Sequence, residues 1–244
     1  LKFINHNRSM RVPFIIYADF ESFIKSIDTC QPNPDRSYTN KYQKHVPSSF
    51  CYYVCSAGNC YSQEPVMFTA NTEDDDVAQK FIDSLIDTVY DIYQKFKFPK
   101  KMIFTKDDQK SFNEATKCHI CDGELNSDRV RDHCHLSGKF RGAAHNDCNI
   151  NYKVPKFIPI VFHNLSGYDC HLFIKKLGGE INCIPNNEEK YISFSKQIEV
   201  DKFVNKQGKE VIVKRELRFV DSYRFMASSL DDLVKNLHKD QCKN

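Results

Sequence analysis

The sequence contains no tryptophan, and it has no apolar run long enough to cross a membrane. A transmembrane helix needs about 20 mostly apolar residues, so we predict none, and no secretory signal peptide is visible. Internal repeats and low-complexity segments are absent too. The formal net charge is only +3, which permits a nucleic-acid partner without demonstrating one. With 41% hydrophobic residues, the chain can bury a core in one large or two small domains.

The chain has eleven cysteines, and an odd count argues against a fully paired secreted framework. Cys51, Cys55, Cys170 and Cys183 lie among apolar residues, where a free cysteine behaves as a small hydrophobe. Cys60 extends a spacing that could bind metal, but packing is favoured because Cys51 and Cys55 belong to one predicted strand. The composition therefore predicts a reducing compartment, nucleus or cytoplasm, and not secretion.

Hydrophobic periodicity predicts both strands and helices. Strands at 12–20, 49–57 and 65–70 should form an antiparallel meander, and a long helix should follow the capping residues 71–76 and end before Pro99. We also expect a loop at 29–48 and a polar boundary at 101–117. Further strands are expected at 157–162, 181–185, 190–196 and 211–220, helices at 168–177 and 226–238, and a hairpin turn at 206–209. The chain starts at Leu1 and ends on a charged helical pattern, so we expect a fragment of a longer protein.

Two acidic residues end the first predicted strand. Asp19 and Glu21 are two residues apart, so both side chains project from the same face. Two carboxylates at the end of a buried strand repel each other and are costly unless a cation or donor lies between them. They are candidate metal ligands, and the alternative is a solvated strand end.

Cysteine and histidine recur with metal-ligand spacing in two pairs, Cys118-x-x-Cys121 and His145-x-x-Cys148. Thiolate and imidazole are the preferred ligands of tetrahedral Zn²⁺, and four protein ligands close a structural site. We therefore predict a structural zinc ion, the alternative being surface thiols without metal. His119, inside the first pair, is expected to be a spectator.

Between the pairs, residues 131–135 read Arg-Asp-His-Cys-His, and Asn149 follows the last ligand. This arrangement resembles the His-Asn-His or ββα-metal nucleases of the endonuclease VII type. The resemblance implies that Asp132 and Asn149 hold one Mg²⁺, that His133 is the general base that activates water, and that His135 steadies a phosphate.

The resemblance covers residues 117–152 and departs from the family at two positions. His145 replaces a cysteine in the second pair, and Cys134 stands between the two histidines, where an acidic residue can occur. An active nuclease and a zinc module that only binds DNA both remain open.

Two further motifs resemble the first two exonuclease motifs of family B DNA polymerases. Tyr17-Ala-Asp19-Phe-Glu21 resembles the Asp-x-Glu motif, and Asn164-Leu-Ser-Gly-Tyr168-Asp169 resembles the second. The sequences around these motifs resemble most the protein-primed branch of the family, which is found in Maverick/Polinton and related virus-like elements. In that group an endonuclease VII-like module lies between these two motifs, so the resemblance covers nearly the whole chain.

The resemblance implies an α/β (α+β) fold: a ribonuclease H-like 3'–5' exonuclease with a mixed sheet, interrupted by a zinc-bound ββα-metal or treble-clef module. The expected division is residues 1–100 and 154–244 for the exonuclease and 101–153 for the insertion. Asp19, Glu21 and Asp169 would coordinate Mg²⁺ or Mn²⁺. Asn164 and Tyr168 would position the primer strand. Asp169 could equally cap the helix that follows it.

The implied partners are DNA, with a single-stranded 3' end at the exonuclease, and a terminal priming protein in the parent polymerase. The third exonuclease motif is expected beyond Asn244, and no polymerase palm motif is found, so we expect no DNA synthesis by this chain and an incomplete exonuclease site. Two alternatives are a free-standing endonuclease and a catalytically inert zinc module.

Overall fold

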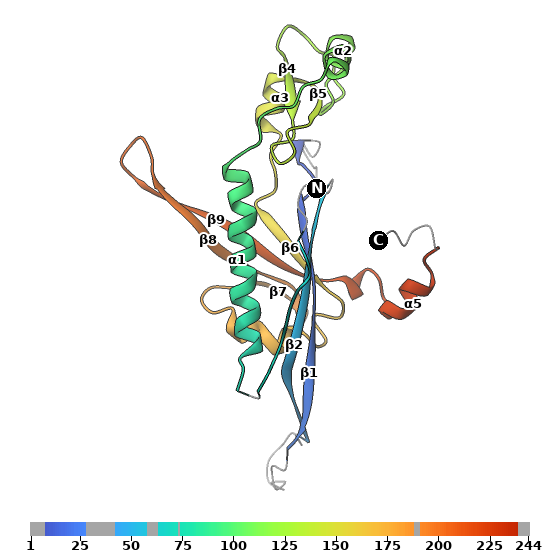
Figure 1. Cartoon of the computed structure of the whole chain (residues 1–244), viewed down its shortest axis with the longest axis vertical. Coiled ribbons are helices and arrows are strands. Elements are labelled where there is room, and N and C mark those ends of the chain that lie inside the picture. The colour runs from blue at the N-terminus through green and yellow to red at the C-terminus, as the bar shows by residue number, and fades with distance from the viewer. Residues whose placement is uncertain (1–7, 28–41, 58–62, 73, 188–190, 239–244) are drawn as a thin grey trace.

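A seven-stranded mixed sheet forms the body of the computed structural model, which describes residues 8–27, 42–57, 63–72, 74–187 and 191–238 (Figure 1). The strand order is β3-β2-β1-β6-β9-β8-β7. The strands are β1 (Phe14–Ser26), β2 (Gln43–Ser56), β3 (Val66–Thr69), β6 (Phe157–Phe162), β7 (Asn182–Pro185), β8 (Tyr191–Val204) and β9 (Glu210–Asp221).

The centre of the sheet is parallel and its flanks are antiparallel. Strand β6 pairs in parallel with β1 on one side and with β9 on the other, and all other neighbours are antiparallel. The register places Tyr17 beside Val161 and Phe162 beside Asp221. The carboxyl ends of β1, β6 and β9 therefore meet at one edge of the sheet.

Helix α1 (Val77–Lys97) covers one face of the sheet (Figure 1). Its N-cap residue Asp76 accepts a hydrogen bond from the Gln79 amide at 3.1 Å, which satisfies one of the free donors at the helix start. Phe81 of α1 is fully buried and packs edge-on against Phe20 of β1, with ring centroids 4.8 Å apart. Because side chains alternate along a strand, the neighbours of Phe20, Asp19 and Glu21, point to the opposite face.

A small unit separates the two parts of the sheet along the chain. It comprises α2 (Lys106–Glu114), the hairpin β4 (Arg129–His133) and β5 (Phe140–His145), and α3 (Asn146–Asn151). It lies beyond one end of the sheet (Figure 1) and has a separate buried cluster, Cys118, Ile120, Ala144 and Cys148. We call residues 117–152 the Cys/His module.

The remaining elements follow β6 and β9. They are α4 (Cys170–Phe173) with a 3-10 turn at Ile174–Lys176, a second 3-10 turn at Ser222–Arg224, and α5 (Leu230–Lys235). No helix in the described part of the chain is long and apolar enough to cross a membrane.

The mixed α/β class and the antiparallel meander of β1, β2 and β3 are confirmed. The expected loop at 29–48 is wrong where β2 already begins at Gln43, and residues 28–41 lie outside the described residues. The polar stretch 101–117 is not only a boundary, because it holds α2. Thr105 and Asp108 form a capping box there and start a helix that has no buried residue.

Two other expectations need correction. The last helix begins at Leu230, capped by Ser229, and not at residue 226. Cys55 and Cys183 are exposed, so they do not act as buried hydrophobes, whereas Cys170 does. Cys60 lies outside the described residues.

Candidate functional site

The carboxyl edge of the parallel strands carries the first candidate site. Asp19 and Glu21 do not end their strand as expected, because β1 continues to Ser26; they lie within β1 just past the level at which its partner β6 ends. Asp169 begins α4 just after the turn that follows β6. Asp169 occupies the N-cap position of α4 but makes no side-chain capping bond. The fold therefore brings the three predicted carboxylates to the same edge of the sheet.

Asp169 is the least solvated of these groups, with 3% of its surface exposed. Burial raises the pKa of its carboxyl from 3.8 to about 7, and the neighbouring charge of Asp19 raises it further, while the Phe20 amide opposes the shift. Its Oδ1 atom is buried and has no hydrogen-bond partner in the described residues. A buried carboxylate oxygen without a donor is costly, and a bound cation would satisfy it.

Asp19 is coupled to both of the other acids. Loss of hydration raises the pKa of its carboxyl, the Phe20 amide lowers it, Glu21 raises it and His163 lowers it. Because Asp19 raises the pKa of Asp169 in turn, positive charge between these two carboxylates would favour their ionisation. Carboxylate oxygens are the ligands that Mg²⁺ and Mn²⁺ prefer, so the residues present fit such a cation.

Asp221 is a fourth acid at this edge, at the end of β9, and it was not predicted as a site residue. It is 3% exposed and accepts hydrogen bonds from the backbone amides of Asn164 (2.9 Å) and Ser166 (3.0 Å) and from the Ser166 hydroxyl (2.6 Å). These bonds outweigh burial and lower the pKa of its carboxyl. Asp221 therefore fixes the turn before Asp169 and is a positioning residue.

The turn itself departs from ordinary backbone geometry. Asn164 has a φ of 71°, and its side chain lies so close to Gly167 that a Cβ atom there would come within 2.3 Å of the amide oxygen. Only glycine fits at that position without a shift. The tight turn places the Asp169 carboxyl near enough to Asp19 of β1 for the two charges to interact.

The two predicted strand-positioning residues have different surroundings. Asn164 is exposed and can reach a ligand. Tyr168 is partly buried, and its hydroxyl bonds to the Ser22 hydroxyl and lies 2.7 Å from His45 Nδ1. It therefore ties the turn to strands β1 and β2.

The second candidate site is the Cys/His cluster. The ligand atoms of Cys118, Cys121, His145 and Cys148 all lie within 4.8 Å of one another. His145 Nδ1 lies 3.5 Å from the Cys121 sulfur and 3.8 Å from the Cys148 sulfur, while its Nε2 atom donates to the Glu124 carbonyl at 2.8 Å. A tetrahedral Zn²⁺ with bonds of about 2.0–2.3 Å separates its ligands by roughly 3.3–3.8 Å. The four residues could therefore hold a metal ion and suit zinc.

The ionisation of the cluster supports the same assignment. Burial alone would raise the pKa of the Cys118 thiol, but the backbone amides of His145, Ile120 and Cys121 outweigh it and lower the pKa to about 6. Burial beside the other sulfurs raises the pKa of Cys148 to about 11. The Cys118 thiol therefore ionises easily enough to bind a metal, whereas the Cys148 thiol needs a bound metal in order to ionise.

The expected endonuclease residues lie on the β4–β5 hairpin and α3, but Asp132 is already engaged. Arg141 binds its two oxygens in a fork, at 2.8 and 2.7 Å, and His119 Nε2 lies 2.9 Å from Oδ2. Burial would raise the pKa of the Asp132 carboxyl, and these two partners lower it instead. His119 stays outside the metal cluster, as expected, but it is a partner of Asp132. Gly142, opposite Asp132, leaves room for His119, since a Cβ there would lie 2.9 Å from it.

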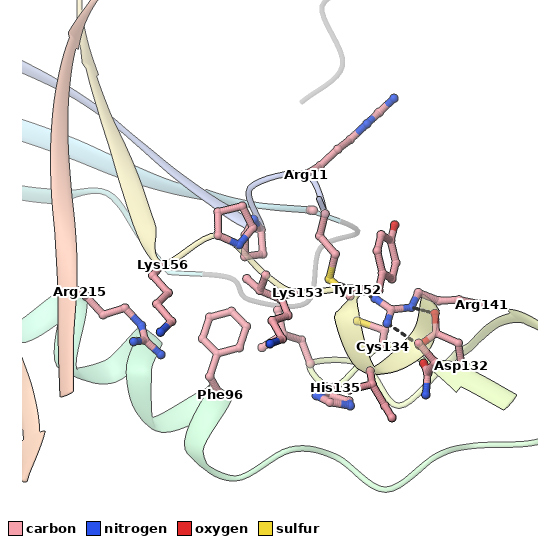
Figure 2. Close-up of a pocket in the computed structure, with 18 residues that line it drawn as sticks. Arg11, Phe96, Asp132, Cys134, His135, Arg141, Tyr152, Lys153, Lys156 and Arg215 are labelled. Carbon is pink, nitrogen blue, oxygen red and sulfur yellow. Dashed lines mark hydrogen bonds and ion pairs between the residues drawn. The ribbon is translucent and has the colours of Figure 1, made fainter. Parts of the chain in front are cut away.

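Asp132, His135 and Asn149 line one cavity of about 750 Å³, whereas His133 is not among its lining residues (Figure 2). The ring centroids of His133 and His135 are 5.0 Å apart. Burial and the nearby His133 and Arg141 lower the pKa of His135. The cavity thus collects three of the four expected residues, with Asp132 held by Arg141.

Comparisons of the chain with protein-family models, with curated proteins and with solved structures found no match. The family resemblances therefore rest on their motifs.

The Asp132–Arg141 pair yields a testable expectation. Replacing Arg141 with Met leaves a buried carboxylate with one partner, and removing one member of such a pair costs about 3 kcal/mol or more. We expect R141M to unfold at a lower urea concentration than R141M combined with D132N, in which no buried charge remains. Equal midpoints for the two variants would show that His119 alone compensates Asp132.

Proposed function

We propose that this chain is the 3'–5' exonuclease region of a protein-primed family B DNA polymerase, of the type found in Maverick/Polinton and related virus-like elements. The observation that carries the proposal is the meeting of Asp19, Glu21 and Asp169 at the carboxyl edge of adjacent parallel strands, with one buried Asp169 oxygen lacking a partner. A mixed sheet with a parallel centre suits the ribonuclease H-like fold that the motifs suggest.

In this proposal Asp19, Glu21 and Asp169 hold Mg²⁺ or Mn²⁺. When bound, such ions lower the pKa of an attacking water and stabilise the leaving 3' oxygen. The chain's own part is to place the ligands. Asp221 fixes the turn before Asp169 through the backbone amides of Asn164 and Ser166.

The substrate in this proposal is a single-stranded 3' end of DNA. Asn164 is exposed beside the carboxylates and is suited to contact the strand. Tyr168 contributes mainly by bracing the turn against His45. The parent polymerase would add the palm and work with a terminal priming protein, and the Cys/His module would be a zinc-bound ββα-metal or treble-clef insertion.

Because the third exonuclease motif is expected beyond Asn244, we expect slow cleavage: the full chain with zinc bound should shorten a 5'-labelled linear oligonucleotide from its 3' end when Mg²⁺ or Mn²⁺ is added. Asp19→Asn should slow this reaction roughly a hundredfold or more, since it removes a carboxylate that would hold the cation at the reacting phosphate. Asp87→Asn, on the exposed face of α1, is the matched control and should keep the wild-type rate.

The same oligonucleotide in circular form separates the alternatives. A circle has no 3' end, so an exonuclease leaves it intact. Nicking that is lost in His133→Ala would instead support an endonuclease VII-like activity, and no cleavage of either substrate would support an inert zinc module. The ion pair of Asp132 with Arg141 argues against the endonuclease, because it occupies the oxygens that a metal would need.

A further inference from the structure

The cavity between the sheet and the Cys/His module carries an excess of positive charge. Its cationic lining residues are Arg11, Arg141, Lys153, Lys156 and Arg215. Its only carboxylate is Asp132, which Arg141 and His119 already neutralise. In the described part of the chain, no carboxylate forms an ion pair with Arg11, Lys153, Lys156 or Arg215.

Part of the positive charge in the cavity lining is buried, as Arg215 shows. Its guanidinium donates to the Lys214 carbonyl at 3.0 Å and lies over the Tyr93 ring at 5.2 Å. Burial lowers its pKa, so the charged form is poorly hydrated. Figure 2 shows Arg215 and Lys156 beside Phe96 at one end of the cavity, and the Arg141–Asp132 pair at the other. An anion in the cavity would therefore meet cations supplied by both structural units.

Most of the remaining lining is apolar, namely Met10, Pro13, Ala57, Phe96, Leu136, Ile150, Val154 and Pro155. The other four lining residues are Cys134, His135, Asn149 and Tyr152. Ile150 is 61% exposed, so part of this apolar surface is open to a ligand. A cavity of about 750 Å³ is far larger than an inorganic phosphate needs and falls in the range that holds organic ligands. Apolar walls beside unpaired cations match a ligand with a flat apolar part and several negative charges.

We propose that this cavity binds a nucleoside phosphate, with the base against the apolar walls and the phosphates at Lys153, Lys156 and Arg215. The ligand is either a free nucleotide or the terminal nucleotide of a strand, since both present the same chemistry. Arginine and lysine are the usual partners of phosphate oxygens.

This site is separate from the proposed exonuclease site. Pro13 precedes β1 and Lys156 precedes β6, so the cavity lies at the amino ends of these two strands, whereas Asp19 lies in the middle of β1 and Asp169 follows the carboxyl end of β6. Six residues of β6 span about 20 Å. Binding in the cavity is therefore independent of the carboxylates.

The test is calorimetric titration of the zinc-bound full chain with deoxyadenosine triphosphate, without added divalent ions. Wild type should bind, and Lys153→Gln with Lys156→Gln should weaken binding by at least about tenfold for each lost charge-assisted contact. The matched control is Lys206→Gln with Lys209→Gln, two exposed lysines in the β8–β9 turn, which should bind as wild type does. Asp169→Asn should also bind normally.

Three reference ligands decide the class. Deoxyadenosine should bind much more weakly than its triphosphate, and so should tripolyphosphate. Equal binding of tripolyphosphate would overturn the nucleotide assignment, and equal binding of deoxyadenosine would overturn the role of the cations. No binding of the triphosphate, or equal losses in the two lysine pairs, would overturn the proposal whether or not the exonuclease assay succeeds.

A decanucleotide with and without a 5' phosphate separates the two sources of the ligand. Tighter binding of the phosphorylated strand than of the free nucleotide, with competition between them, assigns the cavity to a strand terminus. Tighter binding of the free nucleotide assigns it to a free nucleotide. Binding of both strands with equal affinity and no competition with the nucleotide would contradict a nucleotide site here.

Discussion

Asp169→Asn is expected to stabilise the fold while abolishing cleavage. The folded protein holds the pKa of this carboxyl near 7, against 3.8 ordinarily, because the side chain is buried beside Asp19. An upward shift of about three pH units corresponds to about 4 kcal/mol, since each unit is about 1.4 kcal/mol. An amide keeps the shape of the side chain and removes the charge, so the variant escapes this cost.

The pH dependence follows from which state binds the proton. Between about pH 4 and pH 7 the unfolded chain releases the Asp169 proton while the folded chain keeps it, so wild-type stability falls as pH rises. Above about pH 7 both states are ionised and the full cost is present. Asp169→Asn should therefore exceed wild type in its free energy of unfolding by up to about 4 kcal/mol at pH 8, and by almost nothing below pH 4.

Urea denaturation at pH 3.5 and pH 8, without added divalent ions, measures both values. Adding Mg²⁺ or Mn²⁺ at pH 8 should then stabilise wild type and not the variant, because a ligand that binds only the folded state raises its stability. Asp87→Asn is again the control and should match wild type at both pH values. A variant less stable than wild type at pH 8 would mean that protein donors, and not a cation, compensate the Asp169 charge.

The sequence paired Asp19 with Glu21 because they share a strand face. Asp169 was grouped with them through the resemblance of its motif to the second exonuclease motif, since local spacing does not predict which distant strands pair. The Cys118, Cys121, His145 and Cys148 set was predictable from its spacing. Only two residues separate the members of each pair, so local backbone geometry holds the two side chains close together.

The engagement of Asp132 was not predictable in this way. Arg141 reaches it because the β4–β5 register sets Asp132 opposite Gly142, and His119 arrives from the first cysteine pair. Such contacts depend on how three segments pack.

Helix α2 could have been predicted from Thr105 and Asp108, whose spacing is that of a capping box and which do start α2. The charge-rich composition of that stretch was instead interpreted as a boundary.

Loss of zinc is expected to unfold the Cys/His module and leave the sheet folded. The buried cluster of the module is Cys118, Ile120, Ala144 and Cys148, so two of its four buried members are candidate metal ligands. A core this small cannot offset the chain entropy of residues 117–152. The folding free energy must then come from the metal, and structural zinc supplies on the order of 10 kcal/mol in small domains.

Mass spectrometry of the purified chain should find one zinc ion per molecule in wild type and none in Cys118→Ser. Hydrogen exchange should show fast-exchanging amides throughout 117–152 in that variant, with protection of β1, β6 and β9 retained. Cys134→Ser is the matched control, since this thiol belongs to the same module and is not in the metal cluster. It should keep both the zinc and the slow amides.

His145 allows a finer test of the ligand set. His145→Cys replaces one zinc ligand with another and should keep the metal, although it removes the hydrogen bond from Nε2 to the Glu124 carbonyl. His145→Ala leaves three ligands and should bind zinc much more weakly, with partial loss of amide protection. If His145→Ala keeps its zinc as firmly as wild type, the imidazole is not a ligand. The short distances from Nδ1 to Cys121 and Cys148 would then be hydrogen bonds of a metal-free cluster.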